Sequence, residues 1–133
     1  MEKKIIHSKD LSVRWGDMDA YGHVNNIFYF LYVQEARADM LLAKNIFQSN
    51  ESMPVLAEVS CKFIRSIKFP ETITIETFFV SANGKKLLLE TIIKSSTNHQ
   101  LVYAILQSTI VWFDFINNCS TELTAHILSS LTE

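Results

Sequence analysis

The segment from Asn25 to Asn45 constrains the fold most, because it is the longest stretch without glycine or proline in the first half of the chain. Its first part, "IFYFLYV", has the aromatic and β-branched content of a strand, whereas its second part, "QEARADMLLAK", consists of strong helix formers. Nothing breaks the chain between the two parts, and their combined length is typical of a helix. We therefore predict one long helix that begins at Asn25 or Asn26, where an asparagine can cap the first turn, and ends near Asn45.

The first two turns of this predicted helix are apolar on nearly every side. A helix that lies on a protein surface has one apolar face, whereas a helix that is apolar all round is surrounded by other parts of the protein. We therefore expect the remaining elements to wrap around the helix.

The rest of the chain has the apolar, β-branched and aromatic pattern of strands. A short first strand is predicted at residues 10–16, before the helix. The four strands predicted after the helix are "VLAEVSCKFIR", "ETITIETFFVSA", "KKLLLETIIKSS" and "LVYAILQSTIVWFDF". The turn signals between them are Pro70, Asn83-Gly84 and Asn98-His99. Because the connections are short, we predict an antiparallel meander of about five strands and an α+β fold. A short C-terminal helix is predicted in "ELTAHILSSL", after Thr121.

The last predicted strand is apolar on both of its faces. One face carries Leu101, Tyr103, Ile105, Val111, Phe113 and Phe115, and the other carries Val102, Ala104, Leu106, Ile110 and Trp112. One long helix can cover only one side of a sheet, so the second side is most simply covered by another copy of the chain. We predict a homo-oligomer, and the pattern leaves open whether it is a dimer or a tetramer.

Length and composition indicate one globular domain over residues 1–133, because 48% of the residues are hydrophobic and only 20% are charged. The formal net charge of -2 offers no general attraction to nucleic acid or to anionic membranes. No apolar run approaches the roughly 18 residues of a membrane span, and no apolar region follows the basic N-terminal residues. We therefore predict a cytoplasmic protein that does not bind nucleic acid.

The rarer residues exclude several kinds of site. With three glycines, Gly16, Gly22 and Gly84, the chain cannot contain a dinucleotide fingerprint, a Walker A loop or a nucleophile elbow. The four histidines are scattered, so we expect neither a bound metal nor another cofactor. Cys61 and Cys119 are isolated in the sequence and are predicted to be free, half-buried thiols.

The segment "RWGDMDAYGHVNN", residues 14–26, combines acidic residues, a histidine and paired asparagines just before the predicted helix. These residue types are common in turns, so a purely connecting role is one interpretation. However, Asp19 lies a few residues before the free N–H groups and the positive dipole end of the helix. A carboxylate beside donors for an oxyanion is the pairing that acyl transfer requires. The segment is therefore also a candidate active site.

The longer segment "VRWGDMDAYGHVNNIFYFLYVQEAR" resembles the signature of hotdog-fold acyl-CoA thioesterases of the 4-hydroxybenzoyl-CoA thioesterase type. In that signature, an aromatic-x-D-x-D-x-x-G-x-V-N-N pattern leads into the central helix. The later "LAEVSCKFIRSIKFPETITIET" resembles the second segment of the same family, although many members have a proline where Ser66 stands. The resemblance covers nearly the whole chain and implies a hotdog fold, in which an antiparallel sheet wraps around one long helix.

The resemblance also implies roles for particular residues. The essential carboxylate of the family maps to Asp19, which either attacks the thioester carbonyl or acts as general base to a water molecule. The group that polarises the carbonyl is a backbone N–H that maps to Asn26. His23 either orients the thioester or a water molecule or is simply an exposed loop residue. Glu58, which we expect at the start of a strand, occupies a place where some relatives have a second carboxylate; a simple edge or salt-bridge role is the alternative that we favour.

The remaining candidates concern substrate binding and the local turn. Gly22 and Asn25 are expected to turn the chain and begin the helix beside the substrate, whereas Asp17 is expected to hold the turn by hydrogen bonds. The phosphates of coenzyme A require a local basic patch, because the protein as a whole is mildly acidic. The candidates for that patch are Lys62, Arg65, Lys68, Lys85 and Lys86.

The function predicted on these grounds is hydrolysis of an acyl-CoA thioester to the free acid and coenzyme A, at a subunit interface and without a cofactor. Carrier-protein thioesters are an alternative substrate, and the acyl group is left open. A second hypothesis is a non-catalytic hotdog domain that binds an acyl group. A third is an enoyl-thioester hydratase, which is less favoured because the D-x-N-x-x-H arrangement of those enzymes is missing here.

Overall fold

The computed structural model describes residues 3–46 and 52–132. The elements, in chain order, are β1 (Lys4–Ser12), the 3-10 turn η1 (Trp15–Asp17), α1 (Asn26–Ala43), β2 (Ser52–Phe63), β3 (Thr72–Asn83), β4 (Lys86–Ser95), β5 (Val102–Asp114), the two-residue β6 (Cys119–Ser120) and α2 (Ala125–Thr132). The predicted long helix and the short C-terminal helix are confirmed. The predicted limits of the first strand are wrong, because the strand starts at Lys4 and the chain enters a 3-10 turn at Trp15.

Local chemistry explains where α1 begins and ends. The side chain of Asn25 caps the helix by accepting a hydrogen bond from the backbone N–H of Ile27 (3.1 Å). At the other end, Asn45 adopts a left-handed backbone conformation with φ of 58°, which asparagine tolerates better than most residues and which stops the helix. Both predicted ends of the helix are therefore confirmed.

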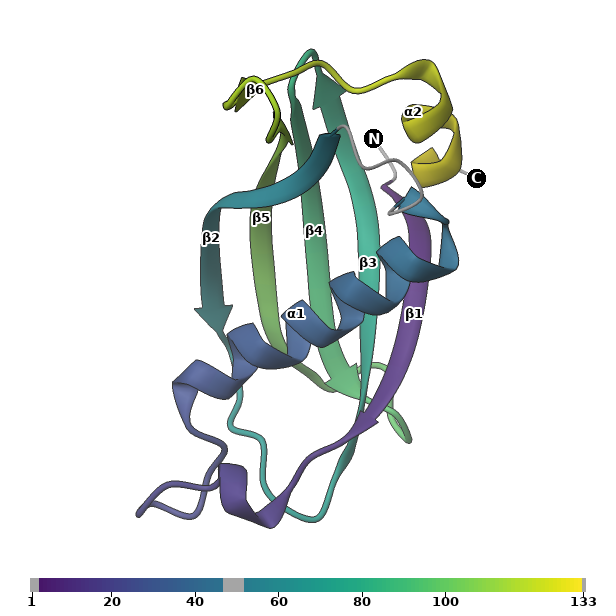
Figure 1. Cartoon of the computed structure of the whole chain (residues 1–133). Coiled ribbons are helices and arrows are strands. Elements are labelled where there is room, and N and C mark those ends of the chain that lie inside the picture. Colours follow the sequence, from purple (N-terminus) through teal and green to yellow (C-terminus); the bar gives the residue numbers. More distant parts are fainter. Residues whose placement is uncertain (1–2, 47–51, 133) are drawn as a thin grey trace.

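The strands form one antiparallel sheet in the order β1-β3-β4-β5-β2, with β6 paired to β5, and α1 crosses one face of that sheet (Figure 1). The predicted meander holds for β3, β4 and β5 but is wrong for β2, which pairs with β5 at an edge. The connection from β2 to β3, residues 64–71, must therefore pass three strand spacings, about 14 Å. Eight extended residues can span up to about 26 Å, so a short connection does not force two strands to be neighbours.

The face of the sheet beneath α1 carries the core. On α1 the buried side chains recur every three or four residues, as a helix packed on one side requires: Tyr29, Tyr32, Val33, Ala36, Met40 and Leu41. Alternate residues of β4 and β5, such as Ile93 and Leu106, meet them from the sheet. In the described part of this chain the sheet curves around only one side of α1, and Ile27 and Leu42 on its outer side are exposed.

The opposite face of the sheet is not covered by any element among the described residues (Figure 1). It is less apolar than β5 alone predicts, because β4 contributes charged residues to it. The Lys3 ammonium lies 2.7 Å from a Glu90 carboxylate oxygen, and the Lys94 ammonium lies 2.5 Å from one of Glu76. Self-association through this face therefore stays a prediction.

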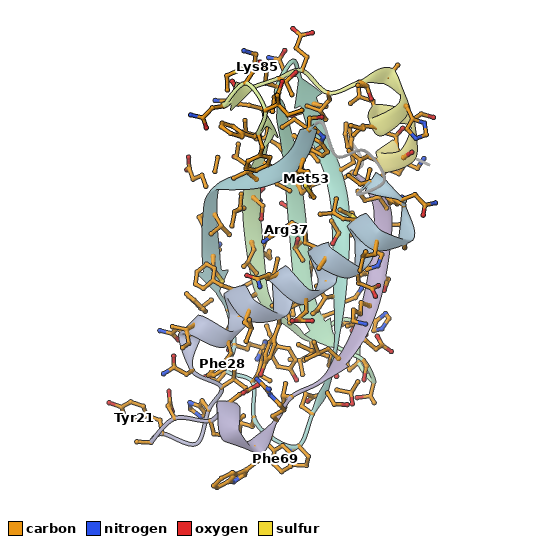
Figure 2. The ribbon with its side chains drawn as sticks, in the orientation of Figure 1. Tyr21, Phe28, Arg37, Met53, Phe69 and Lys85 are labelled. Carbon is orange, nitrogen blue, oxygen red and sulfur yellow. The ribbon has the colours of Figure 1, made fainter. Side chains whose placement is uncertain are left out.

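The molecule has two distinct ends. At one end lie the loop from η1 to α1 and the β2–β3 connection, including Tyr21 and Phe69, and we call this the Asp19 end (Figure 2). At the other, the α2 end, lie the β3–β4 hairpin with Lys85 and the helix α2 (Figures 1 and 2).

Two further sequence expectations concern the cysteines and membrane insertion. Cys61 and Cys119 are both free; Cys61 is half-buried as predicted, whereas Cys119 is exposed, contrary to prediction. Among the helices described, none is both long enough and apolar enough to cross a membrane.

Candidate active site

Asp17 anchors the loop at the Asp19 end. Its side chain is buried, with the residue only 2% exposed, and its carboxylate accepts a hydrogen bond from the Tyr32 hydroxyl (2.6 Å). The Arg14 guanidinium forms an ion pair with the same carboxylate (3.0 Å), and the backbone N–H of Asn25 donates to the Asp17 carbonyl (3.0 Å). Burial and the hydrogen bond to Asp17 raise the pKa of Tyr32, so the tyrosine remains a donor. These contacts agree with the expected structural role of Asp17.

Asp19 opens a tight turn in which its main chain and one carboxylate oxygen are held. Its N–H donates to the His23 carbonyl (2.8 Å), and its carbonyl accepts from Gly22 (3.0 Å). The Oδ1 atom accepts from the Tyr21 N–H (2.9 Å), whereas Oδ2 has no partner among residues 3–46 and 52–132. Gly22 has φ of 76°, a conformation that strains other residues. The turn therefore fixes Asp19 and leaves one carboxylate oxygen free.

The first turn of α1 leaves one donor free beside Asp19. The Asn25 side chain and carbonyl accept from the N–H groups of Ile27 (3.1 Å) and Phe28 (3.0 Å), respectively. The N–H of Asn26, the first residue of the helix, has no acceptor in the described part of the chain. Because the dipole of α1 is positive at this end, the free N–H is a suitable donor for a developing negative charge.

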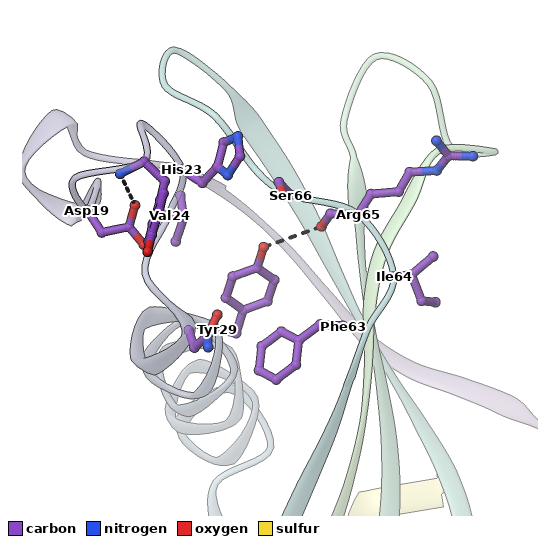
Figure 3. A pocket seen from close by; sticks show the side chains of 10 residues that line it. Asp19, His23, Val24, Tyr29, Phe63, Ile64, Arg65 and Ser66 are labelled. Carbon is purple, nitrogen blue, oxygen red and sulfur yellow. Dashed lines mark hydrogen bonds between the residues drawn. The ribbon is translucent and has the colours of Figure 1, made fainter.

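Asp19 and Asn26 share a hollow of about 330 Å³ between the start of α1 and the end of β2 (Figure 3). We call it the Asn26 hollow. Its lining consists of Asp19, Tyr21, His23, Val24, Asn26, Tyr29, Phe63, Ile64, Arg65 and Ser66. One wall therefore comes from the Asp19 loop and α1, and the other from residues 63–66.

The second wall is held in place by two sets of hydrogen bonds. The N–H groups of Ile64 and Arg65 both donate to the Tyr103 carbonyl (2.9 and 3.0 Å). The chain therefore bends here with Ser66, and not the proline that the resemblance implies for many relatives, at the next position. The Tyr29 hydroxyl donates to the Arg65 carbonyl and accepts from the Ile67 N–H, each over 3.3 Å. Burial raises the pKa of Tyr29, which keeps its hydroxyl protonated.

The structure brings together four of the predicted site residues, because Asp19, His23, Asn26 and Arg65 all line the Asn26 hollow. The guanidinium of Arg65 points away from Asp19 (Figure 3). Gly22 does not line this hollow, and neither does Asn25; their observed contacts are those of a turn and a helix cap.

The other predicted site residues lie elsewhere in this chain. Glu58 is exposed in the middle of β2, beside a bulge, so its expected position at the start of a strand is wrong. Lys85 and Lys86 belong to the β3–β4 hairpin, and Lys85 lies at the α2 end, far from Tyr21 (Figure 2). Within one chain, neither lysine is part of the Asn26 hollow.

Sequence reasoning missed Tyr29, Phe63 and Ile64 as parts of the site. Tyr29 could have been found by its spacing, because it follows the cap residue Asn25 by four positions and so shares its face of the helix. Nothing in the local pattern of Phe63 and Ile64 indicates that their strand ends opposite the start of α1. The described residues contain no group of three His, Cys, Asp or Glu side chains that could hold a metal ion.

The fold is that of a hotdog protein, and the candidate site lies where an acidic loop leads into the long helix. Comparison with known proteins identifies the family. The family model of the thioesterase-like superfamily matches residues 13–131, so the chain belongs to that superfamily. The uncharacterized protein YsmA of Bacillus subtilis (strain 168) is 33% identical over 58 residues, which are 43% of this chain. The match spans only 40% of YsmA.

Solved structures resemble the chain over nearly its full length. PA2801, a putative thioesterase from Pseudomonas aeruginosa, has a TM-score of 0.89 and 29% identity, covering 96% of this chain and 98% of its own. A putative acyl-CoA thioesterase from Xanthomonas campestris has a TM-score of 0.80 and 28% identity, covering 90% and 100%. These similarities confirm the predicted resemblance and the predicted α+β hotdog fold. Together with the family, they support thioester hydrolysis as the type of activity.

Proposed function

We propose that this protein is an acyl-CoA thioesterase in which Asp19 and the N–H of Asn26 act on the thioester carbonyl. The observation that carries the proposal is that the free Oδ2 of Asp19 and the free N–H of Asn26 belong to residues that line one hollow. The carbonyl oxygen would accept a hydrogen bond from Asn26, and negative charge would develop on that oxygen during attack.

Two routes are open for Asp19. As a nucleophile, Oδ2 forms a bond to the carbonyl carbon, the C–S bond breaks, the thiolate of coenzyme A leaves, and water then hydrolyses the mixed anhydride. As a general base, Asp19 takes a proton from a water molecule that attacks the same carbon; the C–S bond then breaks, and the departing thiolate receives the proton. Both routes give the free acid and the thiol, and both need the carboxylate. His23 lines the same hollow, and we assign it the role of orienting the thioester or a water molecule.

Arg65 is the residue that we retain for binding coenzyme A. Its guanidinium extends away from Asp19 (Figure 3). This direction suits the phosphates of coenzyme A, because the long arm of coenzyme A separates its phosphates from the thioester sulfur. Lys85 and Lys86 could add to this site only from another copy of the chain. A carrier-protein thioester is compatible with the same reaction.

Self-association, as a dimer or a tetramer, is part of the proposal. The outer edge of β2 has no strand partner in the described chain, and exposed apolar residues lie along it and on α1 nearby, among them Leu56, Phe63 and Phe30. Unpaired apolar edges favour pairing with another chain. Sedimentation of the purified protein tests this, since a monomer at micromolar concentration would contradict it. A cytoplasmic location, which agrees with two free cysteines, remains a proposal as well.

The experiment that tests the reaction measures thiol release from a panel of acyl-CoAs by the wild type and by Asp19→Asn. We expect at least a hundredfold lower kcat for Asp19→Asn with a thermal midpoint close to that of the wild type. Glu122→Gln is the matched control, because Glu122 is an exposed carboxylate outside the site.

Activity close to that of the wild type in Asp19→Asn would contradict the mechanism. A thermal shift with acyl-CoA but no thiol release would favour the non-catalytic acyl-binding domain. Loss of the enoyl absorbance of crotonyl-CoA without thiol release would favour a hydratase.

A further inference from the structure

A second hollow, of about 500 Å³, lies at the Asp19 end and shares Asp19 with the Asn26 hollow. We call it the aromatic hollow, because Trp15 and Phe69 line it together with Gly16, Met18 and Asp19. Trp15 comes from η1 and Phe69 from the β2–β3 connection, so two segments far apart in sequence meet here. The volume is within the usual range for sites that bind small molecules.

The two aromatic side chains are unusually open to solvent. Trp15 is 75% exposed and Phe69 is 45% exposed, whereas the other tryptophan, Trp112, is 0% exposed. An indole and a phenyl ring that share one hollow offer a large apolar surface, which gains free energy when a ligand covers it. Asp19, whose carboxylate the proposed reaction uses, lines the same hollow.

The charges of the two hollows differ. The Asn26 hollow has Arg65 and His23 in its lining, whereas the described residues that line the aromatic hollow include no cationic side chain and only one acid, Asp19. The phosphates of coenzyme A therefore suit the Asn26 hollow, and an uncharged apolar group suits the aromatic hollow. Since Asp19 lines both hollows, a thioester at Asp19 can extend one arm into each of them.

We propose that the aromatic hollow receives the acyl group of the substrate and that Trp15 and Phe69 set the preference for long or aromatic acyl chains. This inference rests on the proposed thioesterase function and adds to it where the acyl group lies. It predicts that selectivity among acyl groups, more than the rate on the smallest substrate, depends on these two side chains.

The first test uses the fluorescence of Trp15. Because Trp112 is buried in the core, a change in emission on ligand addition reports mainly on Trp15. Asp19→Asn protein, in which the thioester stays intact, is titrated with coenzyme A, acetyl-CoA and decanoyl-CoA. We expect a saturable blue shift with decanoyl-CoA and none with coenzyme A, and loss of that shift in the Asp19→Asn, Trp15→Phe double variant. Equal shifts with all three compounds, or no shift, would overturn the inference.

The second test compares kcat/KM for decanoyl-CoA and acetyl-CoA in two variants. Trp15→Ala removes apolar surface from the hollow. Gly16→Leu adds a side chain to it, and a Cβ at Gly16 would meet no heavy atom within 4 Å. We expect each variant to lower the ratio of decanoyl-CoA to acetyl-CoA about tenfold. In Trp15→Ala one large apolar contact is lost, and in Gly16→Leu the added side chain occupies room that the decanoyl chain needs. Phe115→Ala, which alters an aromatic residue that is 58% exposed outside both hollows, should leave the ratio unchanged.

The outcomes separate this inference from the proposed function. If thiol release depends on Asp19 but neither variant changes the ratio, the thioesterase function stands and the acyl site lies elsewhere. If no acyl-CoA is hydrolysed, the proposed function fails, and the fluorescence titration alone decides whether the hollow binds acyl chains. If Trp15→Ala changes the sedimentation of the protein and not the ratio, the aromatic surface is a contact between copies, and the inference is wrong.

Discussion

The two ends of the molecule differ in whether their unpaired polar groups and their aromatic rings lie in the core or beside a hollow. At the α2 end, Trp112 is fully buried together with Leu123, Ile127 and Leu131, and the helix α2 closes the core. At the Asp19 end, one carboxylate oxygen and one backbone N–H have no partner among the described residues, and aromatic rings are open to solvent. The Trp112 indole N–H also lacks a partner among the described residues, but it is enclosed in the core. The unpaired groups that lie beside a hollow are at the Asp19 end, so the α2 end should provide stability and the Asp19 end function.

The largest effect on stability is expected from Trp112→Ala, at the α2 end. Removal of a fully buried indole should lower the free energy of unfolding by about 3–5 kcal/mol, because a cavity remains in the core. Denaturant unfolding measures this change, and KM for acyl-CoA should stay within twofold in the fraction that remains folded. The exposed residue Phe115 provides the control, and Phe115→Ala should change stability by less than about 0.5 kcal/mol. A tenfold change of KM in Trp112→Ala would mean that the two ends are coupled.

A smaller effect on stability, but with loss of activity, is expected from Asp17→Ala. The Tyr32 hydroxyl would then be buried without its acceptor, which should lower the free energy of unfolding by about 2 kcal/mol. The backbone carbonyl of Asp17 also accepts a hydrogen bond from the N–H of Asn25. When the side-chain anchor is lost, the loop should shift together with Asn25, and kcat should fall about tenfold or more.

Tyr32→Phe is the matched variant, because it removes the same hydrogen bond while Arg14 keeps its ion pair with Asp17. Its activity should lie between those of the wild type and Asp17→Ala. Full activity in Asp17→Ala would show that the loop does not depend on this anchor.

Asn25→Ala should lower stability by about 1 kcal/mol, since the helix α1 loses its cap. The variant also frees the N–H of Ile27 beside that of Asn26, so a second donor becomes available near the carbonyl. Thermal unfolding and kcat are measured together, with Asn25→Asp as the conservative variant that restores an acceptor. If Asn25→Ala and Asn25→Asp unfold at the same temperature, the cap contributes nothing.

The smallest effect concerns the two thiols, one on β2 and one on β6 near the α2 end. Burial raises the pKa of Cys61 to about 11, so at pH 8 only about one molecule in a thousand carries its thiolate. Cys119 is exposed. Alkylation by iodoacetamide, followed by mass spectrometry, should therefore modify Cys119 first, and modification of Cys61 should accelerate as the pH rises toward 11. Faster modification of Cys61 at pH 8 would show that the β2 edge opens.

Properties that depend on neighbours in the chain could be predicted from the sequence. The helix was predicted because "QEARADMLLAK" continues "IFYFLYV" without a break, and Asn25 caps it as expected. Asp19 and Asn26 were predicted to lie close together because only six residues separate them. The position of β2 could not be predicted, because strand alternation indicates which residues share a face and not which strands are neighbours.

The same limit explains the site residues that were misplaced. Phe63 and Ile64 line the same hollow as Asp19 only because β2 ends opposite the start of α1, and no local sequence pattern contains this long-range relation. Lys85 and Lys86 looked suitable by charge alone, but their hairpin lies at the α2 end (Figure 2). Glu58 was expected to begin a strand that in fact starts at Ser52, because the pattern gives the limits of a strand less well than its existence.

The hydroxyl of Tyr29 joins the two walls of the Asn26 hollow, since it bonds to the Arg65 carbonyl and the Ile67 N–H from the first turns of α1. The start of the helix and the segment after β2 are therefore joined by two hydrogen bonds. A substrate that pushed these walls apart would have to break both bonds, so the present spacing of the walls is favoured before binding. If the protein acts on acyl-CoA as proposed, this spacing favours a slender arm such as pantetheine over a bulky one.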